Sequence, residues 1–443
     1  MKAISLFSCG GIGDLALNEQ GIDVLVANEI SYERSQVFCY NFPNVEMIIG
    51  DIWEEKNNII TKTKNSLDDE KLDFVFATPP CQGMSKNGRG KLLSLVRKGE
   101  RPKIDPRNRL VIPAIDIFIE LGADTLIMEN VPEMQNTLIP KNSSESDLLT
   151  IPDYISYRLG SNFVRSIKVV EFADYGVPQR RQRLISIFTK DENLKDFINK
   201  NGCVFPPTTH AKNDSSKLPW VTVRDAISHT PPIDASNKKE AVCPNIELHK
   251  IPILDKSKYF WVSNTPTGKT AFDNQCVNPD CGFQKNTTHG SKQDKHGINK
   301  SNKTTPIYCE KCNELLPRPW VEKNGKYRLM KGYTSAYKRM EYDLPSSALT
   351  RNLSYACSDN KLHPEQNRVL SIYEAVILHT IDKYTYYWKR ADGKKVSDKL
   401  IRELIGESIP PYGLSALLRY IIQVKMGRVA ITSGNKKGQL CLL

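Results

Sequence analysis

The sequence predicts an α/β protein with a doubly wound, mostly parallel sheet and a second, smaller domain that is irregular or β-rich. Short apolar runs alternate with helical patterns up to about residue 189, and a glycine-rich turn separates the first run from the first helix. Residues 190–361 are instead rich in Lys, Asn, Ser, Thr and Pro and show little periodicity. We therefore divide the 443 residues into domains at 1–189 and 190–361 and a return segment at 362–443.

Five strands follow from the apolar pattern of the first domain, beginning with Lys2 to Phe7. The next four are "IDVLVANEI", "VEMIIGDI", "LDFVFATPP" and "ADTLIMENVPE". "RLVIPAIDIFIELG" is predicted to be a helix that stops at Gly122, and helical periodicity returns in "LSIYEAVILHTI" and "GLSALLRYIIQVKMG". Because ligands bind beyond the carboxyl ends of strands in such sheets, the polar residues at these strand ends should meet in one crevice.

The composition indicates a globular protein with a polyanionic partner. The formal net charge is +12 and the isoelectric point is about 9.0, which points first to nucleic acid. No apolar run approaches the length that spans a bilayer and no secretory signal opens the chain, so we expect a cytoplasmic protein. The eleven cysteines are then thiols or metal ligands rather than a disulfide framework.

The glycine turn and two acids predict a site for an adenosine-containing cofactor. Gly10 and Gly11 lie in a tight turn that can bring backbone amides close to a ligand. Glu29 ends the second strand and could bind both ribose hydroxyls, whereas Asp51 ends the third and could accept a hydrogen bond from an adenine amino group. A capped helix with two solvated acids is the alternative.

A candidate nucleophile stands directly after the fourth strand. The two prolines of "TPPC" lack N–H donors, end the strand and hold Cys81 at its carboxyl edge. Glu129 ends the neighbouring strand, so a nucleophile and an acid should lie side by side. Arg181 and Arg183 stand two apart on an extended segment, should point the same way, and could clamp a phosphate or a substrate carbonyl.

Nine short stretches occur in a distinctive order along the chain. They are "FSCGGIGDL", "NEI", "GDI", "TPPCQGMS", "DPRNRL", "MENV", "YGVPQRRQR", "HPEQNRVLSIYEA" and "IGESIPPYGL". In this order they resemble the motifs of the DNA cytosine-5 methyltransferases of bacterial restriction–modification systems. The resemblance covers about residues 1–189 and 362–425 and implies a Rossmann-like methyltransferase fold.

The resemblance implies transfer of a methyl group from S-adenosylmethionine to C5 of a flipped cytosine within a specific DNA sequence. Cys81 would add to C6 and Glu129 would hold N3, while Arg181 and Arg183 would hold the extruded nucleotide. The base must leave the duplex because the thiolate approaches the face of its ring. The implied cofactor-binding residues are Phe7, Gly10, Gly11, Ile12, Glu29, Ile30, Asp51, Ile52 and Pro79.

The sequence departs from the usual family pattern at a few positions. Cys9 and Thr78 stand where the family usually has Gly, and Met84 stands where it usually has Phe. Glu407 replaces the usual Asn of the last motif and puts a charge near the end of the cofactor pocket or at the domain hinge. The Cys, Glu and Arg set is intact, so we expect an active enzyme.

Two regions are expected to contact double-stranded DNA. Residues 82–107 should form a basic loop that closes over DNA, with Gln82, Ser85, Lys86 and Arg89 among its contacts. The second domain should read the target sequence, as the resemblance implies. Its basic and aromatic residues alternate between 318 and 340, at Trp320, Tyr327, Arg328, Lys331, Tyr333, Tyr337, Lys338 and Arg339. The alternative is a solvated hairpin with ordinary aromatic packing, and "SSALTRNLSYACS" adds Thr350 and Arg351 as contact candidates.

Two cysteine pairs predict a structural zinc ribbon at about residues 272–316. "CVNPDC" contains Cys276 and Cys281, and "CEKC" contains Cys309 and Cys312. A Gly follows the first pair and an Asn the second, which favours tight turns whose N–H groups face the thiolates. His289, in the polar tract that we expect to be a mobile loop, could replace one thiolate. Disulfides and unrelated free thiols are the alternatives.

Two other functions remain open from the sequence. A related methyltransferase could act on tRNA, but such relatives usually have a short variable region with a Cys-Phe-Thr stretch, which this chain lacks. A catalytically silent DNA-binding subunit is disfavoured by the intact site residues. We expect a monomer that pairs functionally with a restriction endonuclease and has no membrane contact.

Overall fold

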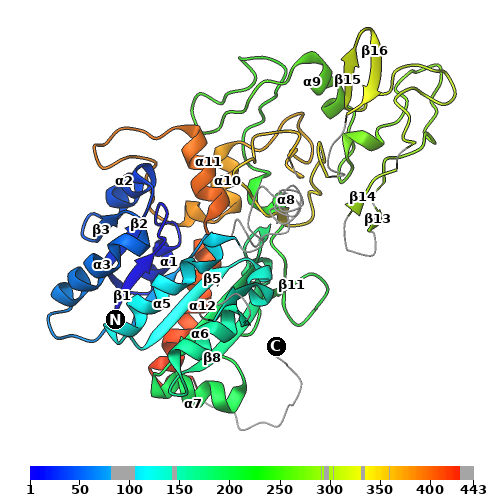
Figure 1. Cartoon of the computed structure of the whole chain (residues 1–443). Helices are drawn as coiled ribbons and strands as arrows, with labels where there is room; N and C mark the ends of the chain where they lie inside the picture. Colours follow the sequence, from blue (N-terminus) through cyan, green and yellow to red (C-terminus); the bar gives the residue numbers. More distant parts are fainter. Residues whose placement is uncertain are drawn as a thin grey trace.

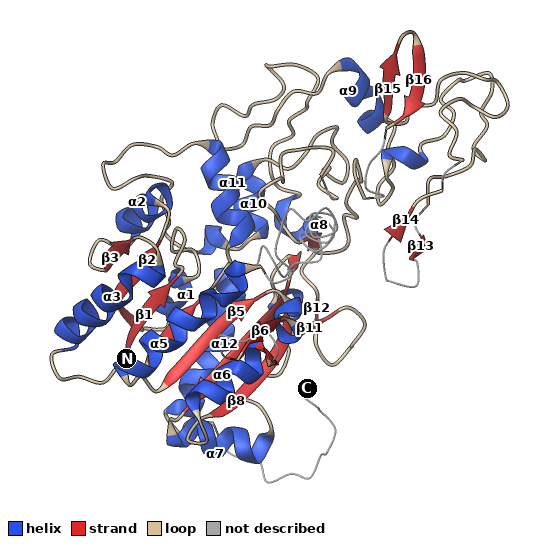
Figure 2. Cartoon of the chain, in the orientation of Figure 1, coloured by secondary structure: helices blue, strands red, loops and turns tan. Residues whose placement is uncertain are grey.

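A seven-stranded sheet forms the larger part of the protein (Figures 1 and 2). The computed structural model describes residues 1–80, 105–141, 147–290, 292–293, 299–302, 304–330, 335–358 and 360–429. The order of the strands is β3-β2-β1-β4-β5-β10-β8. They are β1 (Lys2–Leu6), β2 (Asp23–Glu29), β3 (Glu46–Ile49), β4 (Phe74–Ala77), β5 (Thr125–Asn130), β8 (Val164–Glu171) and β10 (Gln182–Thr189).

The five predicted strands are confirmed and run parallel to one another. β10 runs antiparallel to both β5 and β8. The carboxyl ends of β1 to β5 therefore lie at the same edge as the start of β10. The strand order reverses between β1 and β4, and such a switch point is where sheets of this kind bind ligands.

Helices cover both faces of the sheet. They are α1 (Asp14–Glu19), α2 (Tyr32–Asn41), α3 (Ile52–Leu67), α5 (Val111–Leu121), α6 (Ile151–Leu159), α7 (Glu192–Asn201) and α12 (Pro411–Lys425). α3, α5 and α6 pack on one face, and α1, α7 and α12 pack on the other. The predicted stop of α5 at Gly122 is confirmed, because this glycine caps the helix with φ 63°. Among the described residues, no helix has the length and apolar character needed to cross a membrane.

Alternating residues of each strand enter the two hydrophobic clusters, as the period of a strand requires. On β4, Val75 and Ala77 face the α3–α5–α6 layer, whereas Phe74 and Phe76 face the α1–α7–α12 layer. α7 lies beyond residue 189, yet its buried side chains belong to the second of these clusters. α12 also packs there, so the return segment completes the layer that covers the sheet.

The rest of the chain has few regular elements. Short 3-10 helices are η1 (Pro106–Leu110), η2 (Pro132–Asn136), η3 (Phe172–Tyr175), η4 (Ala271–Asp273) and η5 (Ile381–Lys383). Short strands are β6 (Leu138–Pro140), β7 (Leu148–Thr150), β9 (Gln179–Arg180), β11 (His210–Ala211), β12 (Leu218–Pro219), β13 (Lys292–Gln293), β14 (Asn299–Lys300), β15 (Trp320–Lys323), β16 (Lys326–Leu329) and β17 (Ser346–Ser347). The remaining helices are α8 (Val223–Ile227), α9 (Lys256–Ser263), α10 (Ile372–Leu378) and α11 (Asp398–Glu407).

A separate hydrophobic cluster is built from residues 233–369, and Figure 1 draws its α9 and β15–β16 hairpin at the end of the molecule farthest from α7. Tyr337 and Arg339 are buried in this region, at 2% and 3% exposure, so the prediction that they face DNA is wrong for both. The Arg339 guanidinium instead donates to acceptors of the surrounding loops, namely the carbonyls of Val262, Thr265, His363 and Gln366 and the side chain of Asn367. For these two residues, the alternative that they pack inside the protein is confirmed.

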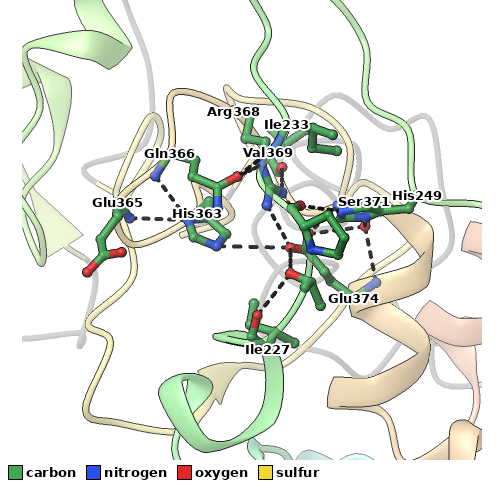
Figure 3. Close-up of polar contacts among 12 residues, drawn as sticks. Ile227, Ile233, His249, His363, Glu365, Gln366, Arg368, Val369, Ser371 and Glu374 are labelled. Carbon is green, nitrogen blue, oxygen red and sulfur yellow. Dashed lines mark hydrogen bonds and ion pairs between the residues drawn. The ribbon is translucent and has the colours of Figure 1, made fainter. Parts of the chain in front are cut away.

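A fully buried ion pair within the return segment also contacts the residues just beyond α8 (Figure 3). Arg368 donates two hydrogen bonds of 2.7 Å to the two carboxylate oxygens of Glu374 on α10. Glu374 also accepts from Thr230, just beyond α8, and caps the start of its own helix through Ser371. Burial opposes ionisation of Glu374, but the charge and hydrogen bonds of Arg368 together with the N–H of Ser371 outweigh burial and lower the pKa of this carboxyl to about 2. The pair therefore stays charged and ties three segments together.

We expect Arg368→Met to lower the free energy of unfolding by about 3–5 kcal/mol, because it leaves the carboxylate of Glu374 buried without its partner. Urea denaturation followed by circular dichroism measures this. The matched control is Arg419→Met, which breaks an exposed pair with Glu19 and should change stability by at most about 0.5 kcal/mol. Equal effects of the two substitutions would contradict this assignment.

Candidate functional site

The end of β4 is fixed to its two neighbouring strands. The hydroxyl of Thr78 donates to the carbonyl of Phe7, 2.9 Å away, at the end of β1. The side-chain amide of Asn130, at the end of β5, donates to the carbonyl of Pro79 over 3.0 Å. Thr78 therefore uses its side chain where the family usually has Gly, and the segment that leads to Cys81 starts beside β5.

Several predicted site residues lie outside the described residues. They are Cys81, Gln82, Ser85, Lys86, Arg89 and Lys331, together with Met84 and Tyr333. The described segment ends at Pro80, the residue before Cys81, and Asn130 binds the carbonyl of the preceding residue, Pro79. Asn130 was missed as a site residue, although it is the central residue of the Glu-Asn-Val motif on which the resemblance depends.

Glu129 and Arg183 meet at the edge where β5 ends and β10 begins. The Nε of Arg183 lies 2.8 Å from the Oε1 of Glu129, and both side chains are largely buried. Burial raises the pKa of Glu129, and the charges of Arg183 and Arg181 offset only part of this effect. Glu129 is thus a carboxyl that takes up a proton more readily than an exposed one.

Arg181 is almost fully buried behind this pair, at 1% exposure. Its guanidinium donates to the carbonyl of Leu349 over 2.9 Å and to the carbonyl of Gly406 over 3.0 Å. The charges of Arg181 and Arg183 both lower the pKa of Glu129. Arg181 has in addition a structural task, because it joins two segments that are distant in the sequence.

The predicted cofactor residues of β2 and β3 lie at the same edge of the sheet. The two carboxylate oxygens of Glu29 accept the N–H groups of Cys9, at 3.0 Å, and Ser31, at 2.9 Å. Ile30 follows and is 66% exposed. Asp51 caps α3 by accepting the N–H of Trp53. The side chains of the predicted residues Ile12 and Ile52 are buried.

The glycine turn is held by close packing as well as by backbone geometry. Gly11 has φ +80°, and a Cβ there would meet the ring of Phe42. The carbonyl of Gly10 accepts the hydroxyl of Tyr386 over 2.6 Å. Cys9 has φ +54°, a left-handed conformation that explains why Gly is usual at this position in the family.

Arg34 on α2 and Glu407 at the end of α11 form an ion pair of 2.8 Å next to the glycine turn. The charges of both residues act on Glu29. Glu407 therefore lies near the acid that is predicted to bind ribose, and its neighbour Gly406 packs against Thr350 and Arg351. Sequence analysis missed Arg34, because nothing in the chain links it to a residue so far away.

The predicted base-reading residues are separated in space. Arg328 is exposed on β16, in the hairpin far from the sheet. Thr350 and Arg351 instead lie against the end of α11, where a Cβ on Gly406 would collide with their backbone. The structure thus brings the 350–351 stretch to the end of α11, next to the Leu349 carbonyl that binds Arg181, and leaves Arg328 at a distance from it.

Four cysteines converge in the second region. The Sγ atoms of Cys276, Cys281, Cys309 and Cys312 all lie within 4.8 Å of one another. The Cys276–Cys312 and Cys281–Cys309 sulfur pairs are 3.6 Å and 3.8 Å apart, which is too long for disulfides. A tetrahedron with metal–sulfur bonds of about 2.3 Å has edges of about 3.8 Å. The spacing therefore suits a tetrahedral metal ion.

The turns after each cysteine pair have the expected form. Gly282 has φ +57° and Asn313 has φ +60°, so both adopt the left-handed conformation that a tight turn needs. The N–H groups of Lys311 and Cys312 face the thiol of Cys309. A nearby buried guanidinium, that of Arg318, donates to the carbonyls of Asn274, Thr287 and Pro306. This arginine ties together the loops around the cluster.

His289 is not part of the cysteine cluster. Its Nδ1 contacts the hydroxyl of Thr305 at 3.0 Å, and its ring stacks on Phe272. The polar tract from 283 to 305, predicted to be a mobile loop, packs at two of its described positions, because Asn286 and His289 are buried. Hydrogen bonds rather than apolar contacts hold it there, and this is why its hydrophilic composition was misleading.

Comparison with known proteins identifies the family. The C-5 cytosine-specific DNA methylase family matches residues 1–423. The type II methyltransferase M1.HgaI of Avibacterium volantium is 27% identical over 430 residues, which cover 95% of this chain and 98% of that relative. M1.HphI of Haemophilus parahaemolyticus, also a type II methyltransferase, is 23% identical over 422 residues, covering 95% of this chain and 86% of that relative.

A crystal structure of an E. coli protein named as a prophage-encoded DNA modification methyltransferase shares the fold. It matches with a TM-score of 0.56 at 18% identity and covers 96% of this chain and 99% of that chain. The family match extends over nearly the whole chain, so this protein belongs to the C-5 cytosine-specific DNA methylases. It is a DNA cytosine-5 methyltransferase, and the family implies S-adenosylmethionine as the methyl donor.

We expect Asn130→Asp to lower the rate of methyl transfer at least about tenfold, because a carboxylate cannot donate to the carbonyl of Pro79 and would repel it. Single-turnover methylation measures this rate. Asn193→Asp is the control, since Asn193 donates to the carbonyl of Lys425 at an exposed position remote from the site. An Asn130→Asp enzyme with an unchanged rate would remove Asn130 from the site.

Proposed function

We propose that Cys81, Glu129 and Arg183 carry the methylation of a flipped cytosine in double-stranded DNA. The observation that supports this most directly is the Glu129–Arg183 pair, which lies at the same sheet edge as the Pro79 segment that leads to Cys81. Attack on cytosine requires a nucleophile at C6 and a proton donor at N3, two atoms that lie across the ring from each other.

The chemistry assigns each residue one task. The thiolate of Cys81 adds to C6 of the cytosine, and electron density moves toward N3 and C5. Glu129 donates a hydrogen bond or its proton to N3, which its raised pKa favours. S-adenosylmethionine supplies the methyl group for C5 when it is bound. A base then removes the C5 proton, the C5–C6 double bond re-forms and Cys81 leaves.

Arg183 and Arg181 orient this acid. Arg183 fixes the position of the Glu129 carboxylate through its 2.8 Å contact and can turn to the extruded nucleotide when the acid is protonated. Arg181 keeps the neighbouring segments in place through Leu349 and Gly406. We therefore assign Arg183 the closer role at the base and Arg181 a positioning role.

The residues at the ends of β1 to β3 fit an adenosine-containing cofactor. Glu29 already accepts two backbone N–H groups, but each carboxylate oxygen can accept a second hydrogen bond, as ribose hydroxyls would provide. The exposed side chain of Ile30 offers an apolar surface for an adenine ring. Phe7, Asp51 and Pro79 complete the edge at which this cofactor would bind.

The two relatives named above are both type II methyltransferases, so we place this protein in a bacterial restriction–modification system beside an endonuclease that cuts the same sequence. Residues 190–361 would then read the target sequence, with Thr350, Arg351 and Arg328 as contacts, and residues 82–107 would close over the DNA. A monomer in the cytoplasm is consistent with this function. Action on tRNA is the alternative that the test below separates.

We further propose that the four cysteines hold a structural zinc ion. The two near-tetrahedral sulfur distances and the left-handed turns at Gly282 and Asn313 support this assignment. Disulfide bonds are disfavoured by the same distances. The cluster lies in the second region, remote from Glu129, so its role is to fold the loops that Arg318 also binds.

Methyl transfer from labelled S-adenosylmethionine tests the function. We expect wild-type protein to label cytosine in duplex DNA and not in tRNA, and Cys81→Ala to label neither while it still binds DNA. A duplex with 5-fluorocytosine at the target should trap wild type covalently, because fluorine cannot leave as a proton does. Mapping methylated cytosines in cells that express the protein gives the target sequence.

A Cys81→Ala protein that methylates DNA at the normal rate would overturn the assigned nucleophile. Labelling of tRNA in place of DNA would overturn the substrate. Glu29→Ala is expected to raise the KM for S-adenosylmethionine with a smaller effect on DNA binding, which distinguishes the cofactor site from the base site.

Elemental analysis tests the metal. We expect about one zinc ion per chain, and its removal by a chelator should unfold the second region and abolish sequence-specific DNA binding without loss of cofactor binding. Cys309→Ser combined with Cys312→Ser should do the same. Cys357→Ser, which changes an exposed cysteine of the same region, is the control. Metal-free protein with a folded second region and full specificity would refute the zinc site.

A further inference from the structure

The C-terminal end of α11 touches both the recognition stretch and the cofactor edge. On one side, Gly406 packs directly on the backbone of Thr350 and Arg351, and a Cβ on this glycine would lie 2.5 Å from the carbonyl carbon of Thr350. On the other side, the next residue, Glu407, pairs with Arg34. Adjacent residues of one helix thus contact two sites with different ligands.

The contact with the recognition stretch is reinforced by buried hydrogen bonds. Arg181 donates to the carbonyls of both Leu349 and Gly406, so one guanidinium bridges the stretch and the helix end. Because neither carbonyl lies in a regular strand or mid-helix, this bridge also satisfies two acceptors that would be costly to bury alone. The 349–351 stretch cannot shift relative to α11 without breaking these bonds.

A second chain of hydrogen bonds runs parallel to the first. Gln179 accepts the N–H of Leu349 and donates to Nδ1 of His379, so the proton of this histidine is on Nε2. Nε2 then donates to the hydroxyl of Ser408, the residue after Glu407. His379 is fully buried, and burial lowers its pKa, so this neutral arrangement is stable.

The contact with the cofactor edge is electrostatic. A glutamate in the last turn of a helix is unfavourable, because the C-terminal end of the helix dipole is itself negative. Arg34 offsets this cost through its 2.8 Å contact with Glu407, and both charges act on Glu29. Glu29 also fixes the N–H of Cys9 in the glycine turn. Leu404 of α11 packs against Gly10 of the same turn, so the position of this helix is linked to that of the acid proposed to hold ribose.

We propose that the Gly406–Glu407 end of α11 couples cofactor binding to target recognition. A cofactor bound at Glu29 stabilises the Arg34–Glu407 pair and thereby holds the recognition stretch in its DNA-binding position. By linkage, bound DNA must strengthen cofactor binding by the same factor. The inference depends on the proposed cofactor and DNA sites, and it adds Arg34, Glu407 and Gly406 as positioning residues.

Titration calorimetry with S-adenosylhomocysteine, in the absence and presence of a hemimethylated duplex that carries the mapped target, measures the coupling. In wild type, we expect the duplex to tighten S-adenosylhomocysteine binding by at least about fivefold. Gly406→Ala pushes a methyl group into the backbone of the stretch, so the factor should fall below about twofold while cofactor affinity without DNA stays nearly unchanged.

Glu407→Gln keeps the shape of the side chain but removes the ion pair, and it should also reduce the coupling factor below about twofold. Arg34→Gln should have the same effect, and the double variant should be no worse than either single one. Glu403→Gln is the matched control, since it makes the same change one turn earlier on α11, where the described residues provide no ion pair. It should couple as wild type does.

Wild-type coupling in folded Glu407→Gln protein would overturn the proposal, and this variant decides the matter if Gly406→Ala does not fold. A wild type that methylates cytosine without any coupling would also refute it. A wild type that does not methylate DNA would instead refute the proposed function, so the two failures can be told apart.

Discussion

The opposite directions of β5 and β10 determine where the site can form. Because the two strands are antiparallel neighbours, the end of one lies beside the start of the other, and Glu129 meets Arg183. The parallel strands β1 to β4 bring the cofactor residues and the Pro79 segment to the same edge. Without this single reversal in the sheet, the arginines would lie at the opposite edge, about one strand length from the acid.

Away from the sheet, buried arginines donate hydrogen bonds to backbone carbonyls that strands and helices would satisfy elsewhere. The second region has few regular elements, so many of its backbone carbonyls lack partners within secondary structure. Arg318 and Arg339 donate to carbonyls of several loops at once, and Arg368 makes a fully buried pair with Glu374. An irregular region can pack densely only if such donors satisfy its buried acceptors.

The departures from the family pattern are accommodated locally. Thr78 uses its hydroxyl to bind the carbonyl of Phe7, and Cys9 adopts a left-handed conformation that costs about 1–2 kcal/mol relative to glycine. Glu407 finds a counter-charge in Arg34. The first two substitutions preserve the shape of the turn, whereas the third introduces a new interaction at the cofactor edge.

By itself, the sequence determined the five parallel strands, the acids at their ends and the two cysteine pairs, because each depends on a pattern within a few residues. Only the tertiary structure decided that Arg181 binds the carbonyl of Gly406, that Arg34 pairs with Glu407 and that Arg339 is buried. These contacts join residues that lie far apart in the chain or face inward from loops without periodicity. A charged side chain in such a loop looks the same in sequence whether it contacts DNA or a buried carbonyl, since only folding decides which acceptor it meets.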